Sequence, residues 1–384
     1  MKKNELEEKF YTRYQKQAEH VFFCPGRVNL IGEHIDYNGG QVMPFAITLG
    51  SYLAVSKNNE NIIRFQSLNF PEQIEFPLQN SYIKTGEEWY NYPLGVINHF
   101  MLDGNPLSGL DLLFYGNLPI GAGLSSSASI EVLMAFAITV IFNIDTSRKE
   151  IALLSKKIEN EFIGVNSGIM DQYAVALGKE NNALLLNCDT VTHRYIPFNL
   201  GKYAAVIINS NKQRTLADSK YNERYAECME ALRLLKEALP ITNLCEINRT
   251  VFDEHSYLIE NPVIRKRALH VVSENERVHI AAEALESGDL EKLGSLLYAS
   301  HQSLKELYEV SGKELDAIVD FSHSFPACLG ARMTGAGFGG CAIALVEKNS
   351  APEYAEKLIA YYTKATGYKP DVFISAVSNG VCEL

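Results

Sequence analysis

The first 200 residues alternate between short apolar runs and longer segments in which apolar residues recur at helical spacing. Runs rich in β-branched and aromatic residues predict strands at 20–24, 41–47, 51–57, 61–67 and 110–116. Helical spacing next to capping residues predicts helices over 2–19, 92–102, 127–142 and 146–162. Thr146 is the expected N-cap of the last helix, with Glu150 in its first turns.

The pattern changes after Asp189. A buried strand is predicted at 203–209, and long charged helices follow over 218–238, 262–284 and 301–325. The C-terminal part reads as strand, glycine-rich loop, strand (341–346), helix (351–366) and strand (371–377). We therefore predict an α+β or mixed α/β protein, with an N-terminal domain of residues 1–200 and a C-terminal domain of residues 201–384.

Composition narrows the class of protein. The chain has 384 residues, of which 47% are hydrophobic, so it can bury sizeable cores and is not disordered. The net charge of −11 argues against non-specific binding to nucleic acid or to an anionic membrane, because both require a basic surface. Small anionic ligands remain possible, since local groups can hold them.

Targeting, membrane and metal signals are missing from the sequence. No apolar stretch follows the two N-terminal lysines as in a secretory signal, and the longest apolar run, 132–144, is too short to span a bilayer. The seven cysteines form no CxxC pair, and the nine histidines form no HExxH motif. The sequence therefore predicts a cytoplasmic protein with reduced, buried cysteines and no protein-built transition-metal site.

Residues 119–129, PIGAGLSSSAS, combine small residues with the start of a predicted helix. Gly121, Ala122 and Gly123 allow backbone N–H groups to approach a ligand closely. The unpaired N–H groups and the dipole of a helix N-terminus bind anions, and the serine hydroxyls add donors or metal ligands. The segment contains no Gly-Lys-Ser/Thr and is therefore not a Walker A loop. A flexible helix cap is the alternative.

A second glycine-rich segment matches the dinucleotide fingerprint only in its letters. Gly335, Gly337 and Gly340 have the G-x-G-x-x-G spacing. The fingerprint should open a helix, whereas here a strand-like run follows. We predict a turn between two strands, packed near the phosphate loop, and discount a nucleotide-binding oxidoreductase.

Two segments are rich in polar groups with potential chemistry. Residues 25–40, PGRVNLIGEHIDYNGG, place Arg27, Glu33, His34 and Asp36 among glycines, as a polyhydroxylated ligand would require, although a solvated turn could look similar for any single residue. Residues 159–173, ENEFIGVNSGIMDQY, place a glutamate at the end of a helix and an aspartate after a small-residue turn. Spacing alone does not give the role of that aspartate.

These stretches together resemble the GHMP family of small-molecule kinases, and within it the galactokinase group. Residues 25–40 are similar to the galactokinase signature, 119–129 to the family's phosphate loop, and 333–346 (MTGAGFGGCAIALV) to its third motif. GIMDQY and SKYNERY are similar to further galactokinase segments, so the resemblance runs from residue 22 to about residue 346. Ile35 and Ser167 depart mildly from the pattern, which usually has Thr and Cys there.

The resemblance implies a two-domain GHMP-kinase fold, with an N-terminal mixed α/β domain, a C-terminal α+β domain and the active site in the cleft between them. It implies ATP-dependent phosphorylation of the anomeric hydroxyl of D-galactose to galactose 1-phosphate, with Mg²⁺, and no obligate protein partner. The implied catalytic residues are Asp171 and Arg27, and the implied Mg²⁺ ligands are Ser127 and Glu159. The implied sugar contacts are Glu33, His34, Ile35, Asp36, Gly168 and Tyr221. The implied nucleotide contacts are Ser67, Gly121, Ala122, Gly123, Leu124, Ser125, Ser126 and Ser127.

Two alternatives stay open at this point. One is a kinase for another sugar, such as N-acetylgalactosamine or arabinose, because a few pocket contacts decide sugar choice. The other is a non-catalytic sugar and ATP sensor. Sensors that resemble galactokinases lack a Ser-Ala pair in the phosphate loop, whereas Ser127-Ala128 is present here.

Overall fold

The computed structural model describes residues 1–119, 123–165, 167–212 and 217–384, with the backbone alone described at 217–219. The first half of the chain contains α1 (Lys3–Tyr14), β1 (His20–Asn29), β2 (Gln41–Val42), β3 (Pro44–Asn58), β4 (Ile62–Ser67), β5 (Gln73–Pro77), α2 (Asn91–Leu102), β6 (Gly109–Gly116), α3 (Ser126–Ile141), α4 (Arg148–Ile158), α5 (Met170–Leu177), β7 (Asn182–Asn187) and β8 (Thr192–Pro197). The second half contains β9 (Tyr203–Asn209), α6 (Ala217–Leu235), α7 (Arg249–His255), α8 (Pro262–Glu286), α9 (Leu290–Ser303), α10 (Gly312–Ser324), β10 (Cys328–Thr334), β11 (Cys341–Glu347), α11 (Ala351–Thr366), β12 (Asp371–Ser375) and β13 (Cys382–Glu383).

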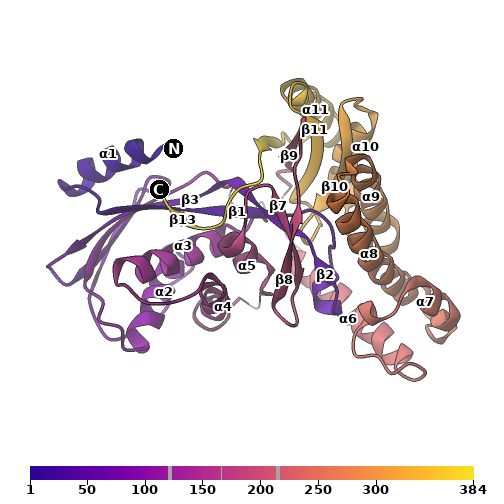
Figure 1. Cartoon of the computed structure of the whole chain (residues 1–384), viewed down its shortest axis with the longest axis horizontal. Coiled ribbons are helices and arrows are strands. Elements are labelled where there is room, and N and C mark those ends of the chain that lie inside the picture. Colours follow the sequence, from indigo (N-terminus) through magenta and orange to yellow (C-terminus); the bar gives the residue numbers. More distant parts are fainter. Residues whose placement is uncertain (120–122, 166, 213–216) are drawn as a thin grey trace.

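The strands of the described residues form three sheets that mix with helices throughout, as predicted for an α+β fold (Figure 1). Their orders are β13-β1-β3-β6-β4-β5, β10-β11-β9-β12 and β2-β7-β8. In the six-stranded sheet, β4 pairs with β6 in parallel and the other pairs are antiparallel. The long strands β1 and β3 extend from the first half toward the second (Figure 1).

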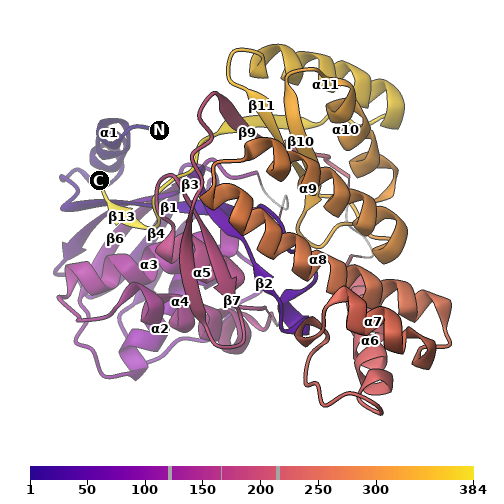
Figure 2. The ribbon, with the colours of Figure 1, turned by 45° about the vertical axis from the view of Figure 1, so that its right-hand side comes forward.

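Helices cover both faces of the six-stranded sheet. Leu6 and Phe10 of α1 pack on Val21, Ala54 and Leu113 on one face. On the other face, α2 to α5 gather beneath the strands, as the view turned by 45° also shows (Figure 2). In the second half, α9, α10 and α11 pack against the four-stranded sheet, and α8 packs on α9 (Figure 2).

The last strand of the chain returns to the first sheet. Strand β13 pairs with β1, so Glu383 lies opposite Phe22, and both termini lie close to α1 (Figure 1). A division into residues 1–200 and 201–384 stays a prediction, and this returning tail would be the part of the second segment that joins the first sheet.

Several predicted elements are confirmed, and others are corrected. Strand β9 and helix α11 have the predicted bounds, and residues 335–340 form the predicted turn between β10 and β11. The predicted turn between 41–47 and 51–57 is wrong, because β3 continues through Gly50. A Cβ on Gly50 would lie 2.2 Å from the carbonyl oxygen of Cys24, so the glycine serves close strand packing.

Two helix predictions are also wrong. The N-cap of α4 is Ser147, because its hydroxyl accepts from the N–H of Glu150 and the Glu150 carboxylate accepts from the N–H of Ser147. The predicted helix over 301–325 is broken by a π turn at Leu304–Tyr308. Strands β5, β7 and β8 were not predicted.

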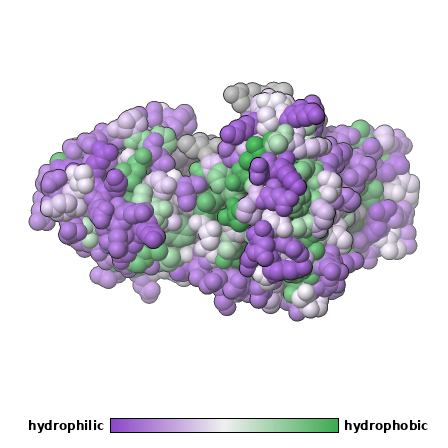
Figure 3. All heavy atoms as spheres, turned by 90° about the horizontal axis from the view of Figure 1, so that it is seen from above, coloured by the Kyte–Doolittle hydropathy of each residue, from purple (hydrophilic) through white to green (hydrophobic). Residues whose placement is uncertain are grey.

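The upper face of the molecule is mainly polar (Figure 3). Seen from above, hydrophilic residues cover most of the surface, and hydrophobic residues gather mainly near the middle (Figure 3). In the part of the chain that the structure describes, we find no helix with the length and apolar character needed to cross a bilayer. The prediction of buried cysteines is confirmed for Cys24, Cys228 and Cys341 and is wrong for the other four, Cys188, Cys245, Cys328 and Cys382, which are partly exposed.

Candidate active site

Arg27 and Asp171 form the centre of the candidate site. Arg27 lies on β1 next to a register shift between Pro25 and Arg27, and Asp171 lies in the first turn of α5. The Nε and Nη2 atoms of Arg27 donate to Oδ1 of Asp171 over 3.0 and 2.8 Å. The arginine side chain is 8% exposed and that of Asp171 is 31% exposed. The pair therefore holds a carboxylate in a fixed orientation at the edge of solvent.

The start of α3 is attached to this pair. Ser125, the N-cap residue, has a left-handed φ of 63°. Its hydroxyl does not cap the helix but donates to Oδ2 of Asp171 over 2.7 Å. Nη1 of Arg27 donates to the carbonyl oxygen of Gly123 over 2.6 Å. A non-glycine residue in this backbone region is uncommon and is often functional. The arrangement brings a helix N-terminus, with its affinity for anions, next to Asp171.

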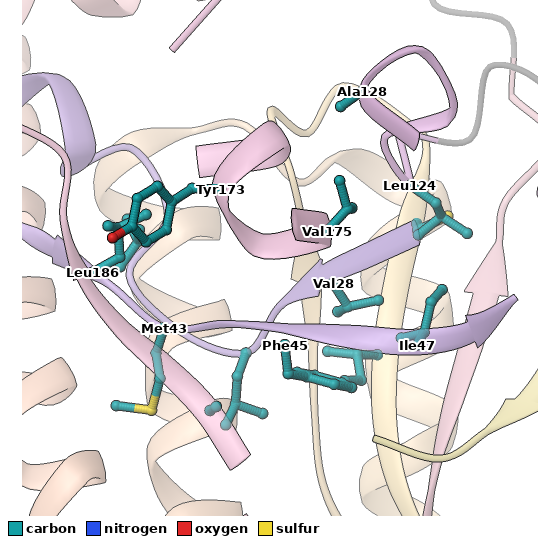
Figure 4. Close-up of a cluster of buried hydrophobic side chains, with 14 of the residues drawn as sticks. Val28, Met43, Phe45, Ile47, Leu124, Ala128, Tyr173, Val175 and Leu186 are labelled. Carbon is teal, nitrogen blue, oxygen red and sulfur yellow. The ribbon is translucent and has the colours of Figure 1, made fainter. Parts of the chain in front are cut away.

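The core beneath the site explains how these side chains are positioned. Val28, Leu124 and Val175 are all fully or almost fully buried, and each is close in sequence to a polar residue of the site. They pack together with Phe45 and Tyr173 in one apolar cluster (Figure 4). Close packing of this kind restricts the backbone from which the polar residues project.

A cavity of about 400 Å³ opens beside the start of α3. Ser67, Ser126 and Ser127 contribute hydroxyl groups to its lining. Phe70 and Trp89 also line it, with ring centroids 6.0 Å apart and planes 13° from parallel. The cavity thus combines hydroxyl donors near a helix N-terminus with stacked aromatic rings, which suits a ligand with phosphates and a planar base.

A buried carboxylate pair lies next to the serines. Oε2 of Glu159 accepts from Ser167 Oγ over 2.7 Å and from Gln172 Nε2 over 2.5 Å. Glu131, one turn after Ser127 on α3, is fully buried, and neither of its carboxylate oxygens has a hydrogen-bond partner among the described residues. Burial, with the nearby charge of Glu159, raises the pKa of Glu131 well above its usual range.

The donors of this region fit Mg²⁺. This ion prefers oxygen ligands and often takes one or two carboxylates together with phosphate oxygens. Ser127 and Glu159 supply a hydroxyl and a carboxylate, which are oxygen donors of this kind. Within the described residues, no group of three His, Cys, Asp or Glu side chains could hold a metal. A protein-only metal cage is therefore not formed by them.

The predicted sugar contacts gather around Asp36 and Glu33. A Cβ on Gly168 would lie 3.7 Å from Oδ2 of Asp36, so the two segments meet there. Burial, together with the negative charges of Glu33 and Asp171, raises the pKa of Asp36 to about 6. Burial and the same carboxylates raise the pKa of Tyr221, which keeps its hydroxyl neutral and able to donate. Several hydrogen-bonding groups are thus concentrated in one place.

His34 and Ile35 are placed differently from the other predicted sugar contacts. Nε2 of His34 donates to the carbonyl oxygen of Ala336 over 3.1 Å, and Nδ1 accepts from the hydroxyl of Tyr37 over 2.9 Å. Burial lowers the pKa of His34 to about 3, so the ring is neutral. Ile35 is fully buried in the core. The structure thus engages both ring nitrogens of His34 within the protein and turns the side chain of Ile35 inward.

Most of the predicted site residues are therefore brought together, although Gly121 and Ala122 lie outside the described residues. The predicted turn at 335–340 contacts the signature segment, since Gly335 N–H donates to Oε1 of Glu33 over 2.8 Å. Three residues near the site are not predicted from the sequence: Glu131, Trp89, and Arg332, whose Nη2 lies 3.3 Å from Oε1 of Glu33. Glu131 could have been found from its position four residues after Ser127, on the same face of a helix.

Parts of the sequence match models of known protein families. Residues 8–57 match the model of the galactokinase galactose-binding signature. Residues 91–179 match the N-terminal domain of GHMP kinases, and residues 281–364 match their C-terminal domain. The fold and site thus define a small-molecule kinase of the GHMP type.

Similar proteins narrow the class. The chain is 48% identical to a galactokinase from Enterococcus faecalis, over 99% of each chain, and 47% identical to one from Clostridium tetani, over 99% of this chain and 97% of that protein. It superposes on Lactococcus lactis galactokinase complexed with galactose with a TM-score of 0.91, 42% identity and 99% coverage of each chain. The chain belongs to the galactokinase family. A Methanococcus jannaschii mevalonate kinase, at 24% identity and a TM-score of 0.69, shares the fold.

Membership of this family makes the protein a sugar kinase, a phosphotransferase that uses ATP as co-substrate. The predicted fold class and enzyme class are confirmed. The roles of individual residues stay predictions and are argued next.

Proposed function

We propose that the protein transfers the γ-phosphoryl group of ATP to the anomeric hydroxyl of D-galactose and releases galactose 1-phosphate and ADP. The observation that carries the proposal is the attachment of Asp171 to both Arg27 and Ser125 at the N-terminus of α3. This attachment supports the proposal because a carboxylate, a guanidinium cation and a helix N-terminus lie within one hydrogen-bonded unit. Phosphoryl transfer mainly requires such positioning and charge stabilisation.

In this proposal Asp171 accepts the proton of the anomeric hydroxyl as that oxygen attacks the γ-phosphorus. Two donors from Arg27 reach Oδ1, and Ser125 reaches Oδ2, so both carboxylate oxygens are oriented before the sugar binds. Arg27 also lies close enough to the start of α3 to stabilise negative charge on the transferred group. The sugar would be held by Glu33, Asp36, Gly168 and Tyr221, with the backbone of residues 34–35 as a further contact.

The nucleotide would occupy the cavity beside α3. Its phosphates would face the helix N-terminus, and residues 121–127 would cradle them. The base would lie toward Ser67 and the stacked rings of Phe70 and Trp89. Ser127 and Glu159 would hold Mg²⁺, which when bound neutralises charge on the phosphates.

The role of Asp171 is tested by the Asp171→Asn variant. The amide keeps the size of the side chain but cannot accept the proton, and a general base contributes about 10²- to 10⁴-fold to rate. We expect kcat to fall by at least about 10²-fold while galactose affinity, measured by calorimetry, changes little. Phosphorylation of galactose by this variant at the rate of the unchanged enzyme would refute the assignment.

Sugar choice is tested separately with the unchanged chain. A panel of D-galactose, N-acetylgalactosamine and arabinose, assayed at saturating ATP with identification of the phosphorylated carbon, should show the highest kcat/KM for D-galactose. A higher value for either other sugar would replace the proposed substrate, and sugar binding without any phosphate transfer would favour the sensor.

A further inference from the structure

The backbone of residues 29–33 accepts and donates hydrogen bonds to buried side chains from the second half of the chain. Nη1 of Arg332, on β10, donates to the carbonyl oxygens of Asn29 and Leu30 over 3.3 and 2.9 Å. The hydroxyl of Thr334 donates to the same Asn29 oxygen over 3.0 Å. Both Arg332 and Thr334 are buried. The backbone at Asn29 and Leu30, shortly before Glu33, is therefore fixed by contacts distant in sequence.

Two residues of α8 that lie one turn apart form hydrogen bonds to the backbone of Gly32 and Glu33. Oε1 of Glu274 accepts from the N–H of Gly32 over 3.0 Å. Nε2 of His270 donates to the carbonyl oxygen of Glu33 over 3.2 Å, while its Nδ1 accepts from the hydroxyl of Ser303 over 2.8 Å. His270 and Glu274 are both fully buried. Consecutive residues of the sugar-signature segment are thus bonded to one face of α8.

Glu274 is itself well compensated in its buried position. Ser300 Oγ donates to its Oε1 over 2.7 Å, and Nε of Arg277 donates to Oε2 over 2.7 Å. Burial opposes its ionisation, but Arg277, His270 and Arg332 together lower the pKa of Glu274 to about 2. Breaking such a buried network is costly, because it leaves unpaired polar groups in the interior.

The side chain of Glu33 is restrained on one oxygen. Its Oε1 accepts from the N–H of Gly335 over 2.8 Å, and Nη2 of Arg332 lies 3.3 Å away. Thr334 Oγ1 lies 3.1 Å from the same oxygen and shares its one proton between Oε1 and the carbonyl oxygen of Asn29. All of these contacts fall on Oε1. The restraint on the backbone and on this oxygen together determine where Oε2 can point.

The local sequence of residues 29–33 alone would allow several backbone conformations. Gly32 has a φ of 100°, which L side chains rarely adopt, and a Cβ there would lie 3.0 Å from the carbonyl oxygen of Gln41 and from the Val278 side chain. Because glycine can adopt many backbone conformations, contacts from elsewhere must select this one. His270 and Glu274 supply such contacts on either side of the Gly32–Glu33 peptide.

We propose that His270 and Glu274 are positioning residues that orient Glu33 for the sugar through the Gly32–Glu33 peptide. They would act on the sugar-binding half of the reaction and not on the nucleotide-binding half. This inference rests on the proposed sugar contact of Glu33. Galactose turnover by the unchanged chain tests the proposed function independently of it.

The test compares His270→Leu with His270→Gln. Leucine removes the donor to the Glu33 oxygen, whereas the glutamine amide can restore it. We expect His270→Leu to raise the KM and calorimetric Kd for D-galactose on the order of tenfold, as expected for loss of one well-placed hydrogen bond. The KM for ATP should stay within about twofold, and His270→Gln should recover most of the galactose affinity.

Ser322→Ala is the matched control for general destabilisation. Ser322 is also fully buried in the second half, where its hydroxyl bonds to that of Tyr354 over 2.6 Å, away from the sugar-signature segment. Its loss should lower the melting temperature without changing the galactose KM. Glu274→Gln, which keeps an oxygen acceptor for Gly32 N–H, should raise the galactose KM less than His270→Leu does.

Three results would overturn the inference while leaving the proposed function intact. They are an unchanged galactose KM in His270→Leu, an equal rise in the KM for ATP and galactose, and a galactose effect of the same size in Ser322→Ala. If His270→Leu does not fold, Glu274→Gln decides the matter. A Glu274→Gln variant whose ratio of galactose KM to ATP KM changes no more than that of Ser322→Ala would overturn the inference.

Discussion

His270 predicts a measurable dependence of stability on pH. Burial is the largest cause that lowers its pKa from 6.5 to about 4. Above pH 6.5 the ring is neutral in the folded and unfolded chains, so the full stability is present. As the pH falls below 6.5, the unfolded chain binds a proton that the folded chain does not, and stability is lost until the pH reaches about 4.

The size of the effect follows from this interval. Between about pH 7 and pH 5, the unfolded chain holds a proton on His270 that the folded chain lacks over roughly 1.5 pH units. Each unit corresponds to about 1.4 kcal/mol, so His270 lowers the free energy of unfolding by about 2 kcal/mol over this range. Other groups act as well. Asp36, whose pKa is raised to about 6, stabilises the folded chain as the pH falls. Such groups are common to the enzyme and to a His270 variant, so a comparison of the two isolates the contribution of His270.

The comparison uses His270→Gln, which cannot titrate but retains a donor. Free energies of unfolding are measured in urea by far-ultraviolet circular dichroism, without sugar, at several values between about pH 7.5 and pH 5. We expect the unchanged chain to lose about 2 kcal/mol more than the variant over this range. Parallel stability curves, or a steeper loss in the variant, would show that His270 is not kept neutral by burial.

Two further predictions concern the Arg27–Asp171 pair. Arg27→Lys should reduce kcat by about 10²- to 10³-fold with little change in melting temperature, because a single ammonium cannot reproduce the contacts to both Asp171 and Gly123. Steady-state kinetics and a thermal melt check this, and a kcat within a few-fold of the unchanged enzyme would contradict it. Gly26→Ala should cost about 1–3 kcal/mol of stability and reduce kcat as well. Its Cβ would lie 2.7 Å from the Leu124 carbonyl oxygen, so β1 must shift away from α3, and full activity at an unchanged urea midpoint would argue against this packing.

Regular elements with strong local patterns could be predicted from the sequence. Helix α11 has the predicted bounds because Pro352 near its start and Gly367 just after its end are local signals. The continuous helix predicted over 301–325 fails for a tertiary reason. Arg267 Nη1 donates to the carbonyl oxygen of Leu307, and Arg224 Nε donates to that of Tyr308, each over 2.7 Å. These distant donors satisfy carbonyl groups that a continuous helix would otherwise use. The local sequence offers only a weak signal nearby, Gly312 with its φ of 78°, at the start of the next helix.

The distinction between local sequence signals and contacts from distant parts of the chain also applies to the site residues. Arg27 and Asp171 lie in recognisable motifs, although only the fold shows that residues 144 positions apart share hydrogen bonds. The sequence predicted His34 as a sugar contact, yet both of its ring nitrogens are bonded to Tyr37 and Ala336. A residue type indicates which bonds are possible, whereas the partners that take up those bonds come from other parts of the chain.

The net charge of −11 places a requirement on how an anionic nucleotide could bind. A negative net charge supplies no long-range attraction for an anion, and Arg27, the cation at the centre of the site, is already paired with Asp171. In the proposed reaction the favourable terms must therefore come from short-range groups, namely the N–H groups at the start of α3, the serine hydroxyls and the metal ion. Short-range contacts are screened little by salt, whereas long-range attraction between exposed charges is screened strongly. The KM for ATP should consequently depend only weakly on ionic strength at constant free Mg²⁺. A steep rise with salt would show that distant positive charges, and not the groups at α3, attract the nucleotide.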